Sequence, residues 1–217
     1  MKTFEDTYLQ RGLRENMCRV LREKDICDER VLAAMGKIPR QFFIDSPFDS
    51  FAYEDRPLPI ACDQTISHPS TVAFQTQLLG VQKNDKILEI GTGSGYQACV
   101  LAELGARVLS IERHEELYRK AQLPIKHLRY FVRTFLGDGY QGLPMSAPFD
   151  KIIITCGAPF VPPALVRQLK TDGIMVIPLG KEDCEMKRLT KISENELKEE
   201  TFGNFKFVPM LEKICRI

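Results

Sequence analysis

Little net charge and no long apolar run set the first limits on what this sequence can be. Its 217 residues carry a formal charge of +1, which argues against a generally basic nucleic-acid-binding surface and against a strongly acidic tail. No stretch approaches the ~18 apolar residues of a membrane span, and residues 1–16 lack the apolar core of a secretion signal. We therefore expect a soluble globular protein, large enough for one substantial core.

Cysteine and histidine are present, but without the spacing of a shared site. The seven cysteines include no CxxC pair, and a scattered, odd set is typical of reduced thiols in the cytoplasm. The three histidines (His68, His114 and His127) have no metal-ligand spacing, so no metal site is expected. The basic stretch 119–133 is interpreted as a solvated helix face, with a nucleic-acid contact as the alternative.

The first third of the chain differs from the rest. Apolar residues recur at helical spacing over residues 4–23, and a second short helix is expected at 28–36, with Gly36 as its stop. A third helix is expected after Pro69. Between the second and third helices, residues 38–69 have little periodicity, and a loop of this length inside a compact domain is more often functional than idle.

Strands and helices are expected to alternate from residue 81 onward. The expected strands are 86–90, 107–111, 131–136, 151–155 and 174–178, and the expected helices are 95–104, 114–128 and 162–170. This alternation predicts an α/β fold with a doubly wound, mostly parallel, Rossmann-like sheet. Polar segments after Pro178 suit antiparallel edge strands.

We predict a single domain over residues 1–217. Within it, residues 1–80 form a helical and loop region that covers the site, 81–180 form the cofactor-binding core, and 181–217 form the edge strands.

The stretch EIGTGSG (89–95) follows an apolar run that is expected to be a buried strand. Gly91, Gly93 and Gly95 would permit a sharp turn close to a ligand, at the crevice where doubly wound sheets bind nucleotides. Glu112 ends the next expected strand, 21 residues after Gly91, where an acidic side chain can accept hydrogen bonds from both ribose hydroxyls. These features predict an adenosine-containing ligand, with a purely structural strand-to-helix turn as the alternative.

Two residues favour S-adenosylmethionine over a dinucleotide. Tyr96 stands where the dinucleotide fingerprint requires a third small residue. Glu89 would repel a pyrophosphate, whereas its carboxylate would attract the sulfonium and ammonium groups of S-adenosylmethionine. The predicted cofactor is therefore S-adenosylmethionine, with S-adenosylhomocysteine as its product.

Seven stretches extend the match beyond the glycine turn. In chain order they are YEDRPLPI (53–60), QTISHPSTVA (64–73), LEIGTGSGYQACVLAELG (88–105), SIER (110–113), GDGYQGLP (137–144), APFDKIIIT (147–155) and FVP (207–209). From about residue 10 onward, the sequence resembles the protein-L-isoaspartate O-methyltransferase family, enzymes that repair damaged aspartyl and asparaginyl sites. The resemblance implies a doubly wound sheet whose last strands are rearranged relative to other methyltransferases.

The resemblance also assigns roles to residues. Ser67 matches the family's active-site serine, and the expected substrate loop comprises Thr65, Ile66 and His68 with Val208 and Pro209. With the glycine turn included, the expected cofactor-binding residues are Pro69, Ser70, Thr71, Val72, Glu89, Gly91, Gly93, Gly95, Glu112, Asp138 and Gly139. From the residues alone, Ser67 could instead cap the following helix, and Asp138 could be a turn residue.

The loop before QTIS departs from the family pattern. Bacterial members usually have glycines where this chain has Ala61, Cys62 and Asp63. We expect the loop to be less permissive here, with an added negative charge near the arriving substrate.

The implied reaction is methyl transfer from S-adenosylmethionine to the free carboxylate of L-isoaspartyl residues in peptides and proteins, which starts repair through a succinimide. That carboxylate is already ionised at neutral pH, so Ser67 would orient it and no general base is needed. We expect a monomer with no specific nucleic-acid partner and no membrane partner. The alternatives are methylation of a small molecule or a nucleic acid, and a non-catalytic cofactor-binding protein.

Overall fold

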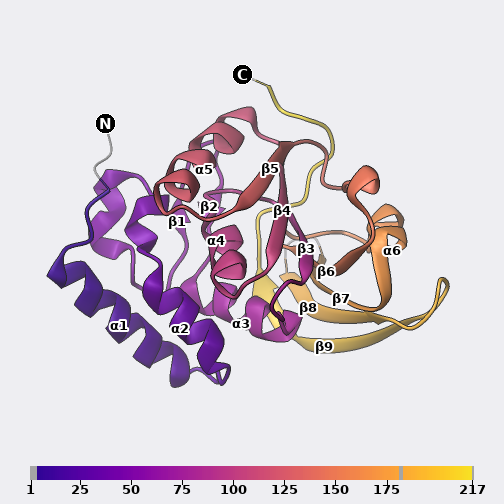
Figure 1. The fold of residues 1–217 in the computed structure, drawn as a ribbon, viewed down its shortest axis with the longest axis horizontal. Helices are drawn as coiled ribbons and strands as arrows, with labels where there is room; N and C mark the ends of the chain where they lie inside the picture. Colours follow the sequence, from indigo (N-terminus) through magenta and orange to yellow (C-terminus); the bar gives the residue numbers. More distant parts are fainter. Residues whose placement is uncertain (1–3, 181–182, 217) are drawn as a thin grey trace.

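Figure 1 shows the fold of the protein in the computed structural model, which describes residues 4–180 and 183–216. The remaining residues of the predicted single domain (1–3, 181–182 and 217) lie outside the described residues.

A seven-stranded sheet forms the centre of the molecule, in the order β5-β4-β3-β6-β7-β8-β9. Its strands are β3 (Lys86–Ile90), β4 (Arg107–Glu112), β5 (Val132–Leu136), β6 (Phe149–Ile154), β7 (Leu169–Gly180), β8 (Asp183–Lys191) and β9 (Leu197–Lys206). The strands from β5 to β7 are parallel, whereas β8 and β9 are antiparallel to their neighbours. The predicted doubly wound, mostly parallel sheet with antiparallel C-terminal strands is therefore confirmed.

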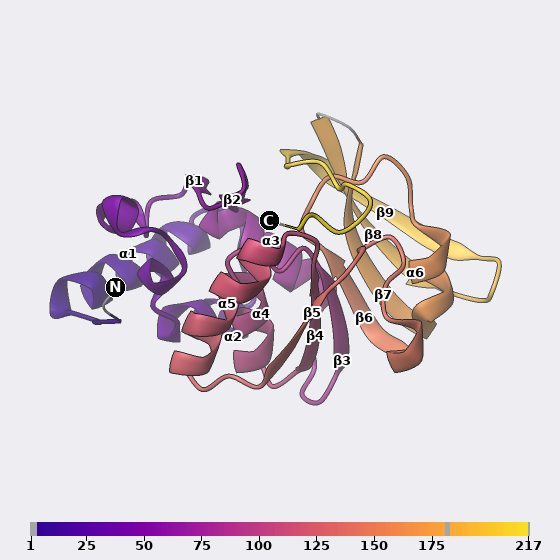
Figure 2. The same cartoon turned by 90° about the horizontal axis from the view of Figure 1, so that it is seen from above.

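Helices cover both faces of this sheet. They are α1 (Tyr8–Arg22), α2 (Glu29–Lys37), α3 (Pro69–Leu79), α4 (Tyr96–Glu103), α5 (Glu115–His127) and α6 (Pro163–Gln168). Figure 2 shows α3, α4 and α5 on one face and α6 on the other, with α1 and α2 as a further layer outside the first face. Within the described residues, no helix is both long and apolar enough to cross a membrane.

Side-chain alternation along the strands explains why both faces need cover. In β3, Leu88 and Ile90 join an apolar cluster with α6, whereas Ile87 joins a cluster with α3 and α4 on the opposite face. Successive side chains of a strand point to opposite faces, so a strand that is apolar at nearly every position requires helices on both.

Two predicted helix boundaries are wrong for identifiable reasons. The first helix begins at Tyr8 because Thr7 forms a capping box with Gln10, in which each side chain bonds the other residue's backbone N–H (3.3 and 3.0 Å). The second helix does not stop at Gly36 but continues to Lys37. Ile38 then takes an extended conformation, because the residue before a proline is disfavoured in the helical region.

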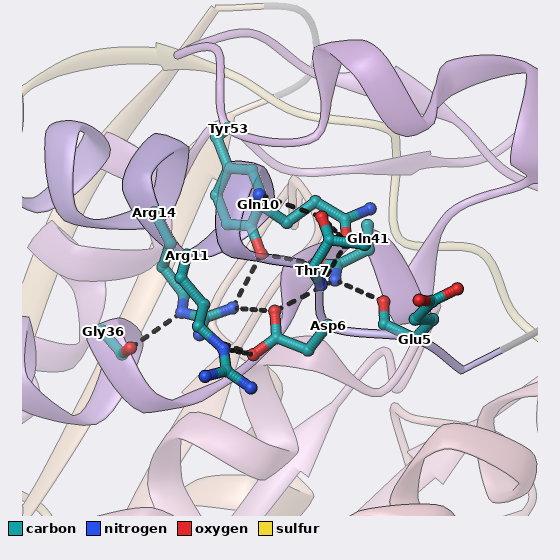
Figure 3. A network of polar contacts seen from close by, with 9 residues as sticks. All are labelled: Glu5, Asp6, Thr7, Gln10, Arg11, Arg14, Gly36, Gln41 and Tyr53. Atoms are coloured by element: carbon teal, nitrogen blue, oxygen red, sulfur yellow. Dashed lines mark hydrogen bonds and ion pairs between the residues drawn. The ribbon is translucent and has the colours of Figure 1, made fainter.

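A polar network fixes the N-terminal layer to the loop that follows it (Figure 3). The buried Arg14 guanidinium donates to both carboxylate oxygens of Asp6 (2.9 and 3.0 Å), to the hydroxyl of Tyr53 (3.0 Å) and to the carbonyl of Gly36 (2.8 Å). The Tyr53 hydroxyl in turn donates to the side-chain oxygen of Gln41. Planar, paired hydrogen bonds of this kind give arginine a defined position, so the segment 36–53 is held firmly against α1.

Candidate functional site

A cavity lies at the carboxyl ends of the central parallel strands. The empty space within it, its open mouth included, measures about 900 Å³. Four segments supply most of the wall: residues 64–67, 90–94, 111–114 and 208–211. This is the edge at which doubly wound sheets bind their ligands, so the cavity is the candidate functional site.

The glycine turn forms the floor of this cavity. Gly91 leaves β3 with a φ of +96° and donates its N–H to the carbonyl of Ile111 at the end of β4 (2.9 Å). A Cβ at position 91 would lie 2.6 Å from the hydroxyl oxygen of Thr155. That hydroxyl donates to the Gly91 carbonyl (2.7 Å), so the turn is clamped between two strand ends. The positive φ and the close contact both require glycine here.

Glu112 supports the turn from the neighbouring strand. The residue is only 4% exposed, and its two carboxylate oxygens accept the N–H groups of Gly93 (2.8 Å) and His114 (2.9 Å). Each carboxylate oxygen has a second lone pair, so Glu112 can still accept a hydrogen bond from a ligand hydroxyl in the cavity that it lines.

Glu89 lies behind the cavity wall, not on it. Its side chain is fully buried and accepts the hydroxyl of Ser110, which also shares a hydrogen bond with the Thr92 hydroxyl (2.6 Å). Burial raises the pKa of Glu89 to about 8. Burial thus favours the neutral carboxyl, and the side chain does not line the cavity, so the charged contact between Glu89 and a ligand that the sequence suggests remains a prediction.

Ser67 reaches the cavity from the opposite side. A short hairpin of β1 (Leu58–Pro59) and β2 (Thr65–Ile66) presents the loop that contains it. The alternative role of Ser67 as a helix cap is not supported, because the free N–H of Ser70 at the start of α3 is accepted by the Asp55 carboxylate (2.9 Å). The Ser67 side chain is therefore not needed to satisfy that helix end.

In the loop before Ser67, two residues that are not glycine have the positive φ values that glycine adopts most easily. Cys62 and Asp63 take φ values of +61° and +55°, in the left-handed region. For residues with a side chain this conformation costs roughly 1–2 kcal/mol each. The expected loss of permissiveness is thus visible as two residues in a strained conformation.

Some of the predicted site residues line the cavity and others do not. Lining it are Thr65, Ile66, Ser67, Val72, Gly91, Gly93, Glu112, Gly139, Val208 and Pro209. Off its wall are His68, Pro69, Ser70, Thr71, Glu89, Gly95 and Asp138. Of these, Asp138 accepts the N–H groups of Tyr140 (2.9 Å) and Lys213 (3.2 Å), which fits the alternative role as a turn residue. The binding roles of all these residues remain predictions.

Sequence reasoning missed several wall residues, of which Gln97 is the most informative. Gln97 is 7% exposed, and its side-chain N–H donates to the Thr76 hydroxyl (2.9 Å). Its side-chain oxygen has no hydrogen-bond partner among the described residues, although it belongs to a residue that lines the cavity. An unsatisfied buried acceptor beside a cavity fits a ligand that donates hydrogen bonds, such as an ammonium group. The residues present therefore fit S-adenosylmethionine.

The C-terminal segment beyond β9 supplies part of the cavity wall, and Figures 1 and 2 show its path from β9 to the C-terminus. Met210 donates its N–H to the carbonyl of Gly157 (2.7 Å), and Cys215 donates to the carbonyl of Arg113 (2.8 Å). These bonds place residues 208–211 on the wall. No periodicity signals such a return, but the FVP stretch at 207–209 marks where it occurs.

The basic stretch 119–133 lies mostly on α5 and turns toward solvent. Arg119 and Lys120 form ion pairs with Glu115 and Glu116 one turn earlier (2.5 and 2.7 Å). Paired charges at this spacing are typical of an exposed helix face, which supports that interpretation over a nucleic-acid contact.

Known proteins resemble this chain over nearly its whole length. The sequence profile of the family Protein-L-isoaspartate(D-aspartate) O-methyltransferase (PCMT) matches residues 12–214. Proteins named protein-L-isoaspartate O-methyltransferase from Christiangramia forsetii and Cytophaga hutchinsonii are 50% and 48% identical, over 96% of this chain in both cases and over 98% and 95% of their own lengths.

Solved structures agree. A structure named protein-L-isoaspartate O-methyltransferase superposes with a TM-score of 0.81 at 27% identity, covering 90% of this chain and 65% of that one. A Plasmodium falciparum protein described under the same enzyme name, in complex with S-adenosyl-L-homocysteine, gives 0.80 at 22% identity over 91% of this chain and 98% of that one, and shows the shared fold. The profile match and the relatives at about half identity confirm the resemblance in the sequence: the chain belongs to the protein-L-isoaspartate(D-aspartate) O-methyltransferase family.

Proposed function

We propose that this protein transfers the methyl group of S-adenosylmethionine to the free carboxylate of L-isoaspartyl residues, the first step of repair through a succinimide. The observation that carries the proposal is the cavity, in which a glycine turn held by Glu112 faces a loop that presents Ser67. Membership of the family and the names of relatives that are about 50% identical support it.

The cofactor half of the cavity comprises the glycine turn, Glu112 and Gln97. We propose that Glu112 accepts the ribose hydroxyls and that the unpaired oxygen of Gln97 accepts an N–H of the ligand. When bound, S-adenosylmethionine supplies an electrophilic methyl group on a positively charged sulfur.

The acceptor half is the loop that carries Ser67. An isoaspartyl carboxylate needs no general base, because it is ionised at neutral pH. The work of the protein is then to hold one carboxylate oxygen in line with the methyl group. We propose that the Ser67 hydroxyl does this by donating a hydrogen bond to the carboxylate.

Matched peptides test the proposal. An isoaspartyl linkage runs the chain through the side chain, so its free carboxylate is attached directly to Cα, whereas that of aspartate lies one methylene further out. Misplacement of a reacting group by about 1 Å can slow a reaction on the order of 100-fold. Incubation with methyl-labelled S-adenosylmethionine should therefore label several unrelated isoaspartyl peptides and almost none of their aspartyl twins. Equal labelling of each pair, or labelling only of a nucleic acid or a metabolite, would refute the assignment.

The proposal extends to the working state of the enzyme. We propose a monomer in the cytoplasm that acts on peptides and not on nucleic acids, as the near-neutral charge and the scattered cysteines indicate. Light scattering at micromolar concentration measures the monomer directly.

Replacing Glu112 with alanine should weaken S-adenosylmethionine binding by roughly 10- to 150-fold, the equivalent of charged hydrogen bonds worth about 1.5–3 kcal/mol. Calorimetric titration measures the affinity. Glu116→Ala is the control, because Glu116 lies four residues further along, pairs with Lys120 and does not line the cavity. Equal affinities of Glu112→Ala and wild type would show that Glu112 only supports the turn.

Replacing Ser67 with alanine should lower turnover or raise the KM for the peptide, while cofactor affinity stays nearly unchanged. The unfolding temperature should also stay unchanged, because Asp55 already accepts the helix N–H. Asp55→Ala is the opposite control: loss of that acceptor should destabilise the protein by about 0.5–2 kcal/mol. A Ser67→Ala protein that loses stability but keeps full activity per folded molecule would restore the capping role.

A further inference from the structure

Arg40 is a buried cation beside the loop that carries Ser67. Its side chain is fully buried, and it lies in a short 3-10 helix, Arg40–Phe43. Its Nε donates to the carbonyl of Ala52 (2.9 Å) and its Nη2 to the carbonyl of Ser67 (2.6 Å). A single side chain therefore links the backbone of Ser67, the proposed acceptor-orienting residue, to a loop 15 residues earlier.

The position of Arg40 is itself fixed by its chain neighbours. Gln41 and Tyr53, which directly follow Arg40 and Ala52, are hydrogen-bonded to each other, and Tyr53 accepts a hydrogen bond from Arg14 (3.0 Å; Figure 3). The hydrogen bonds that Arg40 makes with Ala52 and Ser67 are thus connected to the polar network of the N-terminal layer. A hydrogen bond from a mobile surface residue would not fix the position of the Ser67 backbone in this way.

The charge of Arg40 is also incompletely matched. The carboxylate with the largest influence on it, that of Asp55, is already bonded to Lys24 and to the Ser70 N–H. Its Nη1 has no partner within 3.5 Å among the described residues, and the guanidinium lies 4.8 Å from the ring centre of Tyr96, a neutral side chain that favours the charged form of Arg40. Burying a charge without an ion-pair partner lowers the stability of the folded protein. Arginine does not avoid this cost by losing its proton, because it remains protonated at neutral pH.

This charge lies directly behind the cavity wall. Ser67, which accepts the bond from Nη2, and Tyr96, whose ring stacks near the guanidinium, both line the cavity. The substrate class of the proposed function carries a carboxylate to that wall. A fixed positive charge in a buried position favours an arriving anion more than the same charge would at the surface.

We propose that Arg40 is a positioning residue for the acceptor: it fixes the Ser67 loop and biases that end of the cavity toward a carboxylate. The inference rests on the proposed function and deepens it. Arg40 acts through Ser67 and the local field, and does not touch the reacting atoms.

Three variants separate this role from a structural one. Arg40→Met removes the charge and both hydrogen bonds, and Arg40→Lys keeps the charge but not the planar fork. Lys191→Met is the matched control, because Lys191 is also a buried cation (7% exposed) that donates to two backbone carbonyls, those of Val166 (2.9 Å) and Leu169 (2.8 Å), away from the cavity. For each variant we would measure the unfolding temperature, the affinity for S-adenosylmethionine, and kcat and KM for an isoaspartyl peptide.

The peptide kinetics of folded Arg40→Met should change, with kcat/KM falling by about 10- to 100-fold, while its affinity for S-adenosylmethionine stays within about threefold of wild type. Arg40→Lys should recover part of this loss. Lys191→Met should lose stability and keep wild-type kinetics.

Wild-type peptide kinetics in folded Arg40→Met would overturn the inference and leave the proposed function intact. Should Arg40→Met fail to fold, Arg40→Lys decides, since an unchanged peptide KM and kcat in that variant also overturns the inference. A wild-type protein that labels no isoaspartyl peptide overturns the proposed function and this inference with it.

Discussion

Replacing Gly91 with alanine should destabilise the folded protein by about 2–6 kcal/mol, whereas the same change at Gly93 should cost only about 1–2 kcal/mol. Both glycines have positive φ (+96° and +52°), and both lie in the turn that forms the cavity floor. They differ in what an added Cβ would meet. At position 91 it would lie 2.6 Å from the Thr155 hydroxyl, and at position 93 its nearest neighbour would be a methyl group of Ile60 at 3.7 Å.

A double-mutant cycle separates the two causes. Thr155→Ala removes the hydroxyl that a Cβ at position 91 would strike, but leaves the strain of the positive φ. Urea unfolding of Gly91→Ala, Thr155→Ala and the double variant should therefore show that the second change rescues part of the first. Strict additivity, or equal stability of Gly91→Ala and Gly93→Ala, would show that the clamp from Thr155 does not constrain the turn.

This pair of glycines also shows what the sequence could and could not predict. The spacing of EIGTGSG and Glu112 placed the turn correctly, because strand, turn and acidic residue are local features joined by one βαβ unit. The residue that makes Gly91 less tolerant of a side chain than Gly93 is Thr155, which directly follows β6 and lies more than 60 residues further along the chain. Hydrophobic periodicity carries no information about which side chain follows the neighbouring strand of the sheet.

The same limit explains the missed site residues. Arg40 looked like an ordinary basic residue in an irregular loop, and only its burial against Ala52 and Ser67 marks it. The extent of β7 was underestimated, because its polar first half (Leu169 to Gly173) has no strand pattern of its own. β7 extends to Gly180 because β8 pairs with it along residues 174–180. In each case a distant contact overrides the local signal.

Glu89, predicted from the sequence to attract the cofactor by its charge, gives the second large prediction. Its carboxyl is fully buried, accepts the Ser110 hydroxyl through one oxygen, and has no partner for the other oxygen among the described residues. Burial raises its pKa from 4.5 to about 8. Glutamine resembles the protonated carboxyl in shape and charge, so Glu89→Gln should fold without repacking.

The sign of the pH effect follows from this raised pKa. Below pH 4.5 the carboxyl is protonated in both the folded and the unfolded chain, so titration of Glu89 contributes no difference. Between pH 4.5 and about 8 the unfolded chain releases this proton and the folded chain retains it, so the free energy of unfolding falls as pH rises. Above about 8 the folded chain also releases it, and the loss stops growing.

Glu89→Gln should therefore match the wild type in stability near pH 4 and exceed it by on the order of 3 kcal/mol at pH 7. Urea unfolding of both proteins from pH 4 to pH 9 measures the difference.

A second comparison tests whether the charge of Glu89 nevertheless contributes to ligand binding. S-adenosylmethionine carries a sulfonium that S-adenosylhomocysteine lacks, so a charged Glu89 would make Glu89→Gln weaken the first ligand more than the second. With the neutral carboxyl that its burial implies, the substitution should affect both ligands equally. A pH-independent stability difference, together with selective loss of S-adenosylmethionine, would instead show that Glu89 is ionised and acts on the cofactor from behind the wall.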